Sequence, residues 1–185
     1  IGSDSGGDGA VDASWIRTDV AVLRATTGSG DIYISETDGI ALGDGTSGIN
    51  ATGGAIAVTA GGAMSVHNAV QAAGAITFDA AGTTITVAAG ADVIVGSALM
   101  LFKDPVTHTG GTITAGAVAT GGDAIRFARN YAGTGGTLEG SATTDPNILF
   151  EGDVTLGTFS HTGDTVKLSG TATPVALTTN NQPLG

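Results

Sequence analysis

The sequence predicts an all-β protein, a right-handed parallel β-helix (a solenoid) with rungs of about 20–24 residues. First, a phrase of glycine, a small or acidic residue and two apolar residues separated by one other recurs at 30–34, 54–58 and 74–78. Second, glycine supplies 32 of the 185 residues, and each glycine inside a helix costs about 1 kcal/mol relative to alanine. Third, apolar residues alternate with other residues, often threonine, as half-buried strands require.

The spacing of this phrase sets the length of one rung. Its first apolar residue is Ile32, then Ile56 and then Ile76, in steps of 24 and 20 residues. A repeat of this length is typical of a solenoid, in which neighbouring rungs bury one another. We therefore expect these three isoleucines to stack in one column. The right-handed sense follows from the usual hand of parallel crossovers.

A single β-helix domain is expected at residues 15–177. Residues 1–14 are rich in glycine, serine and aspartate, which indicates a linker or the end of a preceding unit. The regular rungs occupy 28–101, the rungs at 102–177 are looser and carry loops, and residues 178–185 form a polar tail. The domain therefore has one regular and one less regular half.

Each regular rung is predicted to contain two strands separated by glycine corners. Residues 15–25, before these rungs, indicate an atypical first rung. The second strands advance in step with the repeated phrase and carry the pairs Ile40/Leu42, Met64/Val66 and Ile85/Val87. The pairs Val93/Val95 and Leu99/Leu101 continue the pattern. Glycines such as Gly43 and Gly54 suit the corners, where positive φ or close backbone approach favours a residue without a side chain.

Strand patterns return in the looser part of the chain, where Asp-Pro pairs indicate turns. These strands are expected at 112–114, 125–127, 148–150, 154–156 and 166–168. An antiparallel sandwich would also contain many short strands. Two observations favour the β-helix over the sandwich: Asn-Gly and Gly-Asn hairpin turns are absent, and the period is about twice the usual spacing of sandwich strands.

Composition excludes several functions. The net charge is −11 with six basic residues, so neither nucleic acid nor an anionic membrane surface is an expected partner. No apolar run reaches the length of about 18 residues that spans a membrane. The absence of cysteine excludes disulfides and thiolate metal sites. Because the chain begins with Ile1 rather than Met, we expect a processed chain or a fragment.

Residues 28–101 resemble the filamentous haemagglutinin family of bacterial secreted adhesins. The segments that carry the resemblance are Gly30–Gly43 (GDIYISETDGIALG) and Gly53–Val66 (GGAIAVTAGGAMSV). The resemblance implies a β-helical shaft that is exported and then displayed at the bacterial surface or shed. It further implies adhesion or scaffolding, with a host-cell or carbohydrate receptor as partner, rather than catalysis.

An enzyme is the alternative, because parallel β-helices also include polysaccharide lyases and hydrolases. Glycoside hydrolysis needs two carboxylates roughly 5–9.5 Å apart. The pairs Glu36/Asp38 and Glu151/Asp153 have the spacing that places both members on one strand face. Both pairs adjoin a glycine corner, so we interpret them as solvated corner charges that oppose edge pairing. No basic residue is expected near either pair, and Arg126 should point outward between Ile125 and Phe127.

Calcium is the one cofactor that the sequence indicates, and only weakly. Asp4 and Asp8 lie in a Gly/Asp-rich segment, and Asp44 lies in a Gly-Asp-Gly corner. Such oxygen-rich loops bind hard cations, although a flexible polar linker is the favoured interpretation of the first segment. The three histidines lack metal-ligand spacing and are expected at the surface; they are His67, His108 and His161.

Two aromatic residues are candidates for contact with a carbohydrate or a protein partner. These are Trp15 and Tyr131, and Trp15 is alternatively a cap for the open end of the core. The sequence therefore predicts a non-enzymatic extracellular β-helix, either a shaft segment of an adhesin or a subunit of a fibre. Since a solenoid exposes strand edges at both ends, head-to-tail self-association into filaments is part of this expectation.

Overall fold

The computed structural model describes residues 15–116, 123–140 and 148–156, together with the backbone of strands at 160–162, 166–168 and 177–179. The predicted segment 1–14 lies outside the described residues. All regular structure in the described part is β-strand, and the strands form three parallel sheets. The described part of the chain contains no helix long and apolar enough to cross a membrane.

The three sheets contain eight, eight and seven strands in sequential order. Sheet A consists of β1 (Ile16–Thr18), β4 (Ile32–Glu36), β7 (Ile56–Ala60), β10 (Ile76–Asp79), β13 (Met100–Phe102), β16 (Ile125–Phe127), β19 (Ile148–Phe150) and β22 (Val166–Leu168). Sheet B consists of β2 (Val22–Leu23), β5 (Ile40–Leu42), β8 (Met64–Val66), β11 (Ile85–Val87), β14 (Val106–His108), β17 (Tyr131–Gly133), β20 (Val154–Leu156) and β23 (Leu177–Thr179). Sheet C consists of β3 (Ala25–Thr27), β6 (Ile49–Ala51), β9 (Val70–Ala72), β12 (Val93–Val95), β15 (Thr112–Ala115), β18 (Thr137–Glu139) and β21 (Ser160–Thr162).

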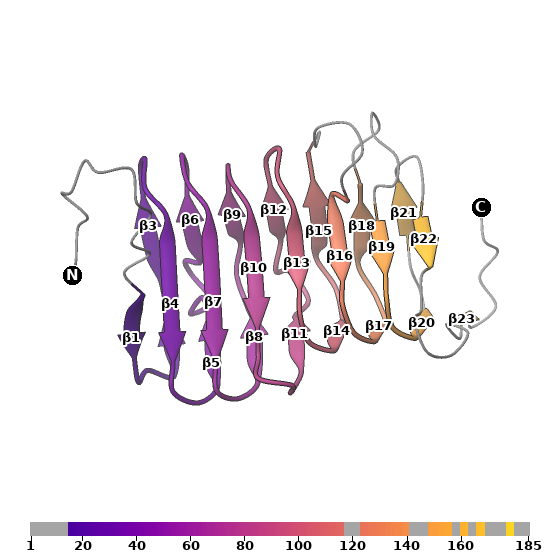
Figure 1. Ribbon diagram of the computed structural model, residues 1–185, viewed down its shortest axis with the longest axis horizontal. Coiled ribbons are helices and arrows are strands. Elements are labelled where there is room, and N and C mark those ends of the chain that lie inside the picture. The colour runs from indigo at the N-terminus through magenta and orange to yellow at the C-terminus, as the bar shows by residue number, and fades with distance from the viewer. Residues whose placement is uncertain are drawn as a thin grey trace.

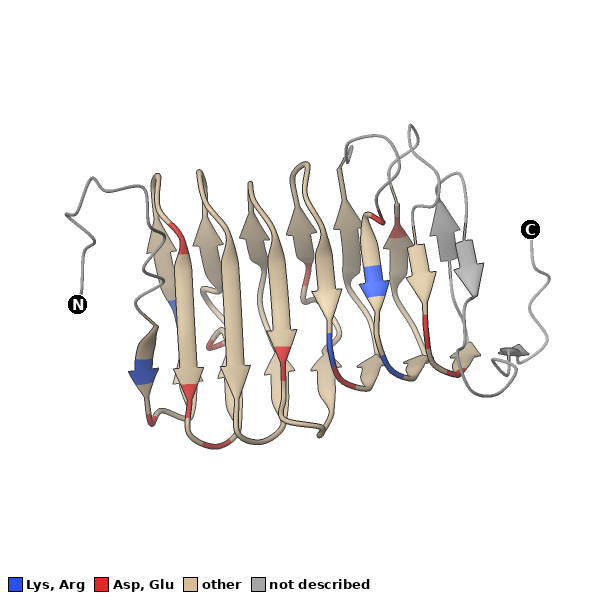
Figure 2. Ribbon diagram, viewed as in Figure 1, with Lys and Arg blue, Asp and Glu red and all other residues tan. Residues whose placement is uncertain are grey.

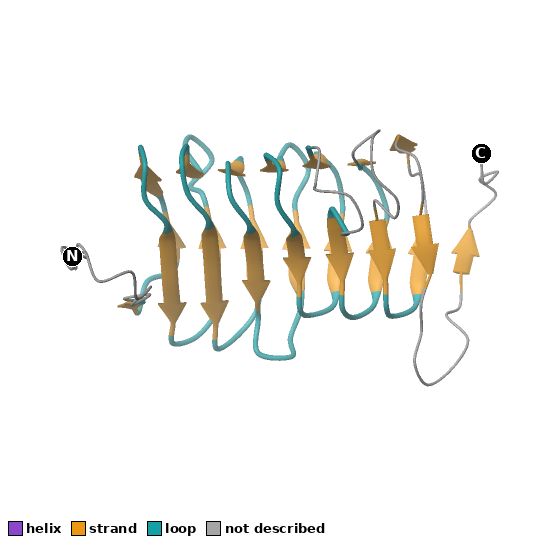
Figure 3. Cartoon of the chain, turned by 45° about the horizontal axis from the view of Figure 1, so that its top comes forward, coloured by secondary structure: helices purple, strands orange, loops and turns teal. Residues whose placement is uncertain are grey.

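The chain visits the sheets in the order A, B, C and then returns to A one coil further on. In Figure 1 the strands of sheet A run downward in front, the chain returns upward behind them, and successive coils advance from left to right, which is a right-handed path. Figure 3 shows the same coils after rotation, with loops joining the strands at the corners. The predicted parallel β-helix is confirmed, and the strands expected in the looser half are present.

The first seven coils of the described structure contain three strands each, whereas the sequence predicted two strands for each regular rung. The missed strands include β6 and β9 of sheet C, whose inward pairs combine one branched residue with alanine (Ile49/Ala51 and Val70/Ala72). The strands β12 and β15 of the same sheet were predicted. A strand of three residues with one large apolar side chain gives a weak alternation signal. The last strand, β23, ends at Thr179, within the segment 178–185 predicted as a tail.

Inward side chains form continuous columns because equivalent residues of successive coils lie in register. The predicted column is confirmed, since Ile32 pairs with Ile56 and Ile56 pairs with Ile76. The second predicted column is confirmed too, with Met64 between Ile40 and Ile85. Like residues thus stack on like, and the inward positions of the inner coils are buried.

The prediction for Leu99 and Leu101 is wrong. Met100 and Phe102 point inward and are fully buried, and Leu101 is the outward residue of β13. Phe102 pairs with Phe78 on one side and Phe127 on the other. The two leucines are two residues apart, so local alternation suggested that both point inward. The inward residues lie one position further on, because the pairing register with the neighbouring coils decides which alternate residues are buried.

Four phenylalanines of sheet A form a ladder inside the solenoid. The ring centroids are 5.5 Å apart for Phe78 and Phe102, 5.0 Å for Phe102 and Phe127, and 4.9 Å for Phe127 and Phe150. The rings of the last two pairs are stacked and nearly parallel, with interplanar angles of 13° and 8°. Tyr131 packs against this ladder at 4.6 Å from Phe127. The less regular half of the chain therefore has the most aromatic core.

Glycine corners are required by geometry at two positions where the sequence predicts them. Gly43 has a φ of +93°, in the left-handed region that favours glycine. A Cβ on Gly54 would lie 2.3 Å from the carbonyl oxygen of Gly30 in the preceding coil. The corners of successive coils are therefore close enough in places to exclude any side chain.

Replacement of Phe127 by alanine should destabilise the fold by about 3–5 kcal/mol, because it leaves a cavity in the centre of the phenylalanine ladder. The matched control is Leu101→Ala, on the half-buried outer face of sheet A. We expect the control to cost less than about 1.5 kcal/mol. Denaturant titrations followed by circular dichroism measure both values, and equal costs would contradict the assigned register.

Candidate functional site

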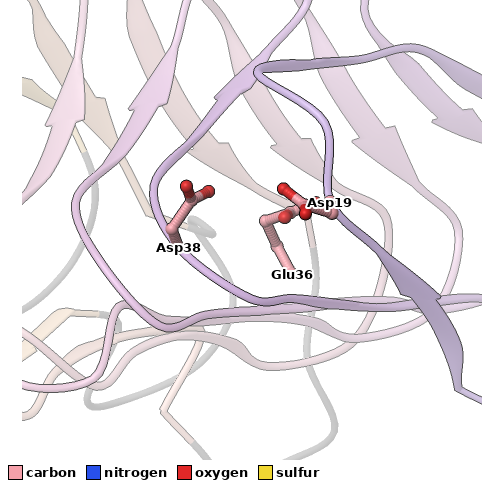
Figure 4. Close-up of side chains that lie close together, drawn as sticks. All are labelled: Asp19, Glu36 and Asp38. Atoms are coloured by element: carbon pink, nitrogen blue, oxygen red, sulfur yellow. The ribbon is translucent and has the colours of Figure 1, made fainter.

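Three carboxylates come together at the turn after the first strands of sheet A (Figure 4). Glu36 is the last residue of β4, Asp19 follows β1, and Asp38 lies in the corner before β5. Oxygens of all three lie within 4.8 Å of one another. Asp19 and Asp38 are exposed, whereas Glu36 is 4% exposed. The sequence singled out Glu36 and Asp38, but not Asp19, which reaches them only because β1 pairs with β4.

Both oxygens of Glu36 are engaged by the protein itself. The Thr18 hydroxyl and the Val20 N–H donate to Oε2, the latter at 3.1 Å, and the Thr37 N–H donates to Oε1 at 2.9 Å. Glu36 occupies an inward position, in register with Thr18 of the first coil. It was predicted to be a solvated corner charge, and this is wrong, because alternation along β4 places it beside Ile34 inside the coil.

The environment of Glu36 favours its ionised form. Burial, the largest single effect, raises its pKa, but hydrogen bonds from Thr18 and three backbone N–H groups together hold the pKa below its ordinary value. A general acid needs the opposite shift, toward neutral pH. The cluster therefore resembles a carboxylate cap on the backbone of the first coil more than an acid–base pair.

Three carboxylates are also a ligand set that suits a hard cation such as Ca²⁺. In this cluster Asp19 and Asp38 are exposed, and Glu36 already accepts hydrogen bonds at both oxygens. A cation bound here would compete with those donors. The geometry accordingly accounts for Glu36 without a metal.

The second predicted pair has a different arrangement. Glu151 follows β19 and forms an ion pair with Arg126 at 2.6 Å, while Asp153 is exposed. The expectation that no basic residue lies near either pair is therefore wrong for Glu151, because pairing of β16 with β19 brings Arg126 beside it. The prediction that Arg126 points outward is confirmed, since Ile125 and Phe127 are buried on either side of it.

Carboxylate and amide side chains at other corners also accept backbone N–H groups from an adjacent coil. The Asp104 carboxylate accepts from Ala80 at 2.6 Å and from Gly82 at 2.9 Å. Four further side chains have the same role, with acceptor and donor as follows: Asp31 from Ala55, Asn68 from Gly45, Asp92 from Thr112 and Asn130 from Asp153. These bonds satisfy corner N–H groups that the strand ladders leave without a partner.

The calcium candidates are only partly visible. Asp4 and Asp8 lie outside the described residues. Asp44 accepts N–H groups of its own loop, from Thr46 at 3.0 Å and Ser47 at 2.9 Å, and pairs with Arg24 at 3.1 Å. The hydrogen bonds from Ser47 and Thr46 lower the pKa of Asp44. Its carboxylate thus has a structural role in the turn.

The two aromatic candidates have opposite environments. Trp15 is 41% exposed and packs against Tyr33 with ring centroids 5.6 Å apart, so it remains available to a partner. Tyr131 is 1% exposed, and the prediction that it contacts a partner is wrong. The reason is that Tyr131 begins β17 in an inward position and packs on the phenylalanine ladder.

The prediction of surface histidines is wrong for His108. His67 is exposed and lies 3.0 Å from the Ser65 hydroxyl, as expected, and His161 is part of β21. His108 is fully buried at the inward end of β14, with its Nδ1 2.8 Å from the hydroxyl of Tyr131. The residues around His108 have a turn-like sequence, so the sequence did not indicate that position 108 belongs to a core column.

Glycines make room for this buried pair. Gly133 is the residue of β17 in register with His108, and a Cβ there would lie 2.9 Å from the Tyr131 ring. A Cβ on Gly136 would lie 2.5 Å from His108 Nε2, which has no hydrogen-bond partner. Burial lowers the pKa of His108, outweighing the opposing effect of the nearby Gly110 and Gly111 backbone. The site therefore favours a neutral imidazole.

The outward faces of the described sheets carry few charged side chains. Figure 2 shows that the described strands are mostly uncharged, with acidic and basic residues concentrated near strand ends and corners. A depression of about 170 Å³ on the outside of sheet C is lined by Asn50, Thr52, Gln71, Ala72, Ala73, Ile94 and Gly96. Pockets for small ligands have volumes of about 300–1,000 Å³. This depression is too small to enclose such a ligand.

Comparison with known proteins gives no family assignment. No protein-family model, curated protein or solved structure matches this chain.

Replacement of Glu36 by glutamine should destabilise the protein by about 1–3 kcal/mol at neutral pH, because a charged acceptor of several hydrogen bonds is lost. Asp38→Asn is the control and should change stability by less than about 0.5 kcal/mol. Since the pKa of Glu36 is lower in the folded state, its contribution is present above the unfolded pKa and disappears as pH falls through the folded pKa. Denaturation at pH 7 and pH 3 measures this, and E36Q should approach wild type at low pH.

The stability of the protein should fall as pH decreases below about 6.5, the ordinary pKa of histidine. Because the folded pKa of His108 is lowered, the unfolded chain binds the proton first, and the slope is at most about 1.4 kcal/mol per pH unit. His108→Gln should reduce this slope. The control His67→Gln, at an exposed site, should leave it unchanged. Equal slopes in wild type and H108Q would exclude His108 as the source.

Proposed function

We propose that this chain is a non-enzymatic extracellular β-solenoid, a shaft segment of a surface adhesin or a subunit of a self-assembling fibre. The observation that carries the proposal is that polar side chains form hydrogen bonds and ion pairs within the solenoid. Glu36, Asp44 and Asp104 accept N–H groups of the coil corners, and Glu151 pairs with Arg126. These groups stabilise a scaffold.

The resemblance of residues 28–101 to filamentous haemagglutinin repeats supports the same role and supplies the expected location, secreted or at a bacterial cell surface. Stacked coils give a scaffold that holds binding groups at fixed spacing along its length. A host-cell or carbohydrate receptor is the proposed partner. The exposed Trp15, backed by Tyr33, is the aromatic contact that suits a sugar ring or a protein surface.

A carbohydrate-active enzyme is the second candidate, and the Asp19–Glu36–Asp38 cluster is the observation in its favour. Lyases and hydrolases need a carboxylate or base that reaches the substrate from a groove. Here the one buried member of the cluster is directed into the coil and held ionised by hydrogen bonds. This arrangement supports the structural assignment over the catalytic one.

The two candidate functions differ in whether the protein cleaves a polysaccharide. The chain should release no reducing ends and no unsaturated uronates from acidic or neutral polysaccharides, with or without CaCl₂, beyond a heat-denatured control. In a separate assay, the protein immobilised on a support should bind glycans or cells from solution. Product that forms with wild type and disappears in E36Q or Glu151→Gln would replace the structural proposal by the enzymatic one. The variant D38N serves as the matched acidic control.

A further inference from the structure

One inward column of sheet B contains a buried ionisable residue. Leu42, Val66 and Val87 occupy this column in successive coils, and His108 follows Val87 in register. The strands β13, β14 and β15 form the fifth coil, and β16, β17 and β18 form the sixth coil beside it (Figure 1). His108 is fully buried in the fifth coil, so the solenoid closes over a histidine at a position that is aliphatic in the preceding coils.

The ring of His108 has a hydrogen-bond partner on one side only. Its Nδ1 lies 2.8 Å from the hydroxyl of Tyr131, which is buried in the sixth coil. Its Nε2 is buried and has no hydrogen-bond partner. Protonation makes both ring nitrogens donors, and the closed structure pairs the donor at Nε2 with no acceptor. A charged ring at this position therefore carries a large desolvation cost.

Glycine corners enclose the unpaired side of the ring. The sequence Thr-Gly-Gly-Thr occurs at 109–112 in the fifth coil and again at 134–137 in the sixth. A Cβ on Gly136 would lie 2.5 Å from Nε2 of His108, and Gly136 has a φ of +93°. Because glycine loses more backbone freedom on folding than any other residue, these corners regain the most freedom when they open.

No opposite charge in the described part of these two coils faces the ring. Tyr131 is the one other titratable side chain at the inward positions of their strands, and the remaining inward residues are apolar or glycine. The carboxylate of Asp104 accepts N–H groups of the fourth coil. The charged residues of the two coils lie at corners or outward positions; they are Lys103, Asp104, Asp123, Arg126, Arg129 and Glu139. Burial is thus the largest effect on the pKa of His108, and it lowers that pKa.

Opening at this point does not have to spread along the solenoid. Each coil contacts only its neighbours, so groups of coils can open as separate units. The inward strand residues from the second to the fourth coil are apolar except for Glu36. The pKa of Glu36 lies below its ordinary value of 4.5, so its contribution to stability is lost only in stronger acid. Between about pH 6.5 and about pH 5, His108 is therefore the buried group of these coils whose charge changes.

We propose that the fifth and sixth coils form an acid-sensitive segment of the solenoid, in which His108 takes up a proton from solvent and the corners at 109–111 and 134–136 open. The imidazolium then reaches water, and Tyr131 separates from the phenylalanine ladder, while the second to fourth coils stay closed. The solenoid thereby becomes flexible at one defined place in mildly acidic surroundings. This property belongs to the fold and applies to a shaft segment and to an enzyme alike.

The direction of the pH effect follows from the different proton affinities of the two forms. In the open form His108 binds a proton with the ordinary pKa of about 6.5, whereas burial lowers its pKa in the closed form. Acid therefore increases the open population below about pH 6.5, by at most about tenfold per pH unit. The increase ends below the pKa of the closed form, because both forms then bind the proton. At neutral pH the segment stays closed.

The experiment is hydrogen–deuterium exchange of the full chain followed by mass spectrometry, at about pH 7 and about pH 5. Labelling times are scaled to the intrinsic exchange rate at each pH. Peptides that contain β14 and β17 should lose up to about thirtyfold in protection, since about 1.5 pH units lie below the ordinary pKa of histidine. Peptides that contain β7 and β8 should change by less than about twofold, because their coils stay closed.

Variants assign the effect to one side chain. His108→Gln stays neutral at both pH values, so the loss of protection in β14 and β17 should shrink to that of β8. The matched control His67→Gln, at an exposed corner, should keep the wild-type loss. His108→Leu is a second neutral variant that suits the apolar column, and the comparison between coils in the wild-type chain needs no variant. Equal loss of protection in all coils, no loss in β14 and β17, or a loss that persists in H108Q would each overturn the inference.

Discussion

Parallel pairing in strict register is the constraint on which the rest of this structure depends. Each strand pairs with the equivalent strand of the next coil, so inward positions fall on inward positions. Columns of like residues follow, and a shift of one residue in any coil would expose its whole core set. The phenylalanine ladder shows the benefit, since four rings stack only because four coils share one register. No coil has a core of its own, and stability is shared between neighbours.

The same constraint produces the polar chemistry at the corners. Strands end at every corner, and their last N–H groups have no ladder partner. Side-chain oxygens of an adjacent coil accept hydrogen bonds from these N–H groups, as Asp104 does from Ala80 and Glu36 does from Val20. Since ionised acceptors form stronger hydrogen bonds than neutral ones, carboxylates suit these positions. Much of the acidity that would suggest a cation site or an active site is thereby explained as backbone capping.

The fold was predictable from the sequence because its signal is repeated. Apolar residues equivalent to Ile32 and Ile40 recur in successive coils at nearly constant spacing. The sheet C strand was not predicted in several coils, because a pair such as Val70/Ala72 carries one large side chain. Tyr131 and His108 were misplaced because their burial depends on their contact with each other and on the packing of Phe127, Gly133 and Gly136 around them, which occurs once in the chain and does not repeat. Asp19 joins Glu36 only through the pairing of β1 with β4. Single occurrences of this kind leave no periodic trace for a sequence to reveal.

A solenoid of this design separates stability from recognition. Inward residues determine the fold, so substitution of outward residues such as Tyr33, Gln71 or Leu101 leaves the columns intact and alters mainly the surface that a partner contacts. The outward residues make no contribution to these columns, so they are free to differ from coil to coil. Lateral faces can therefore diverge in what they bind while the inward columns stay the same.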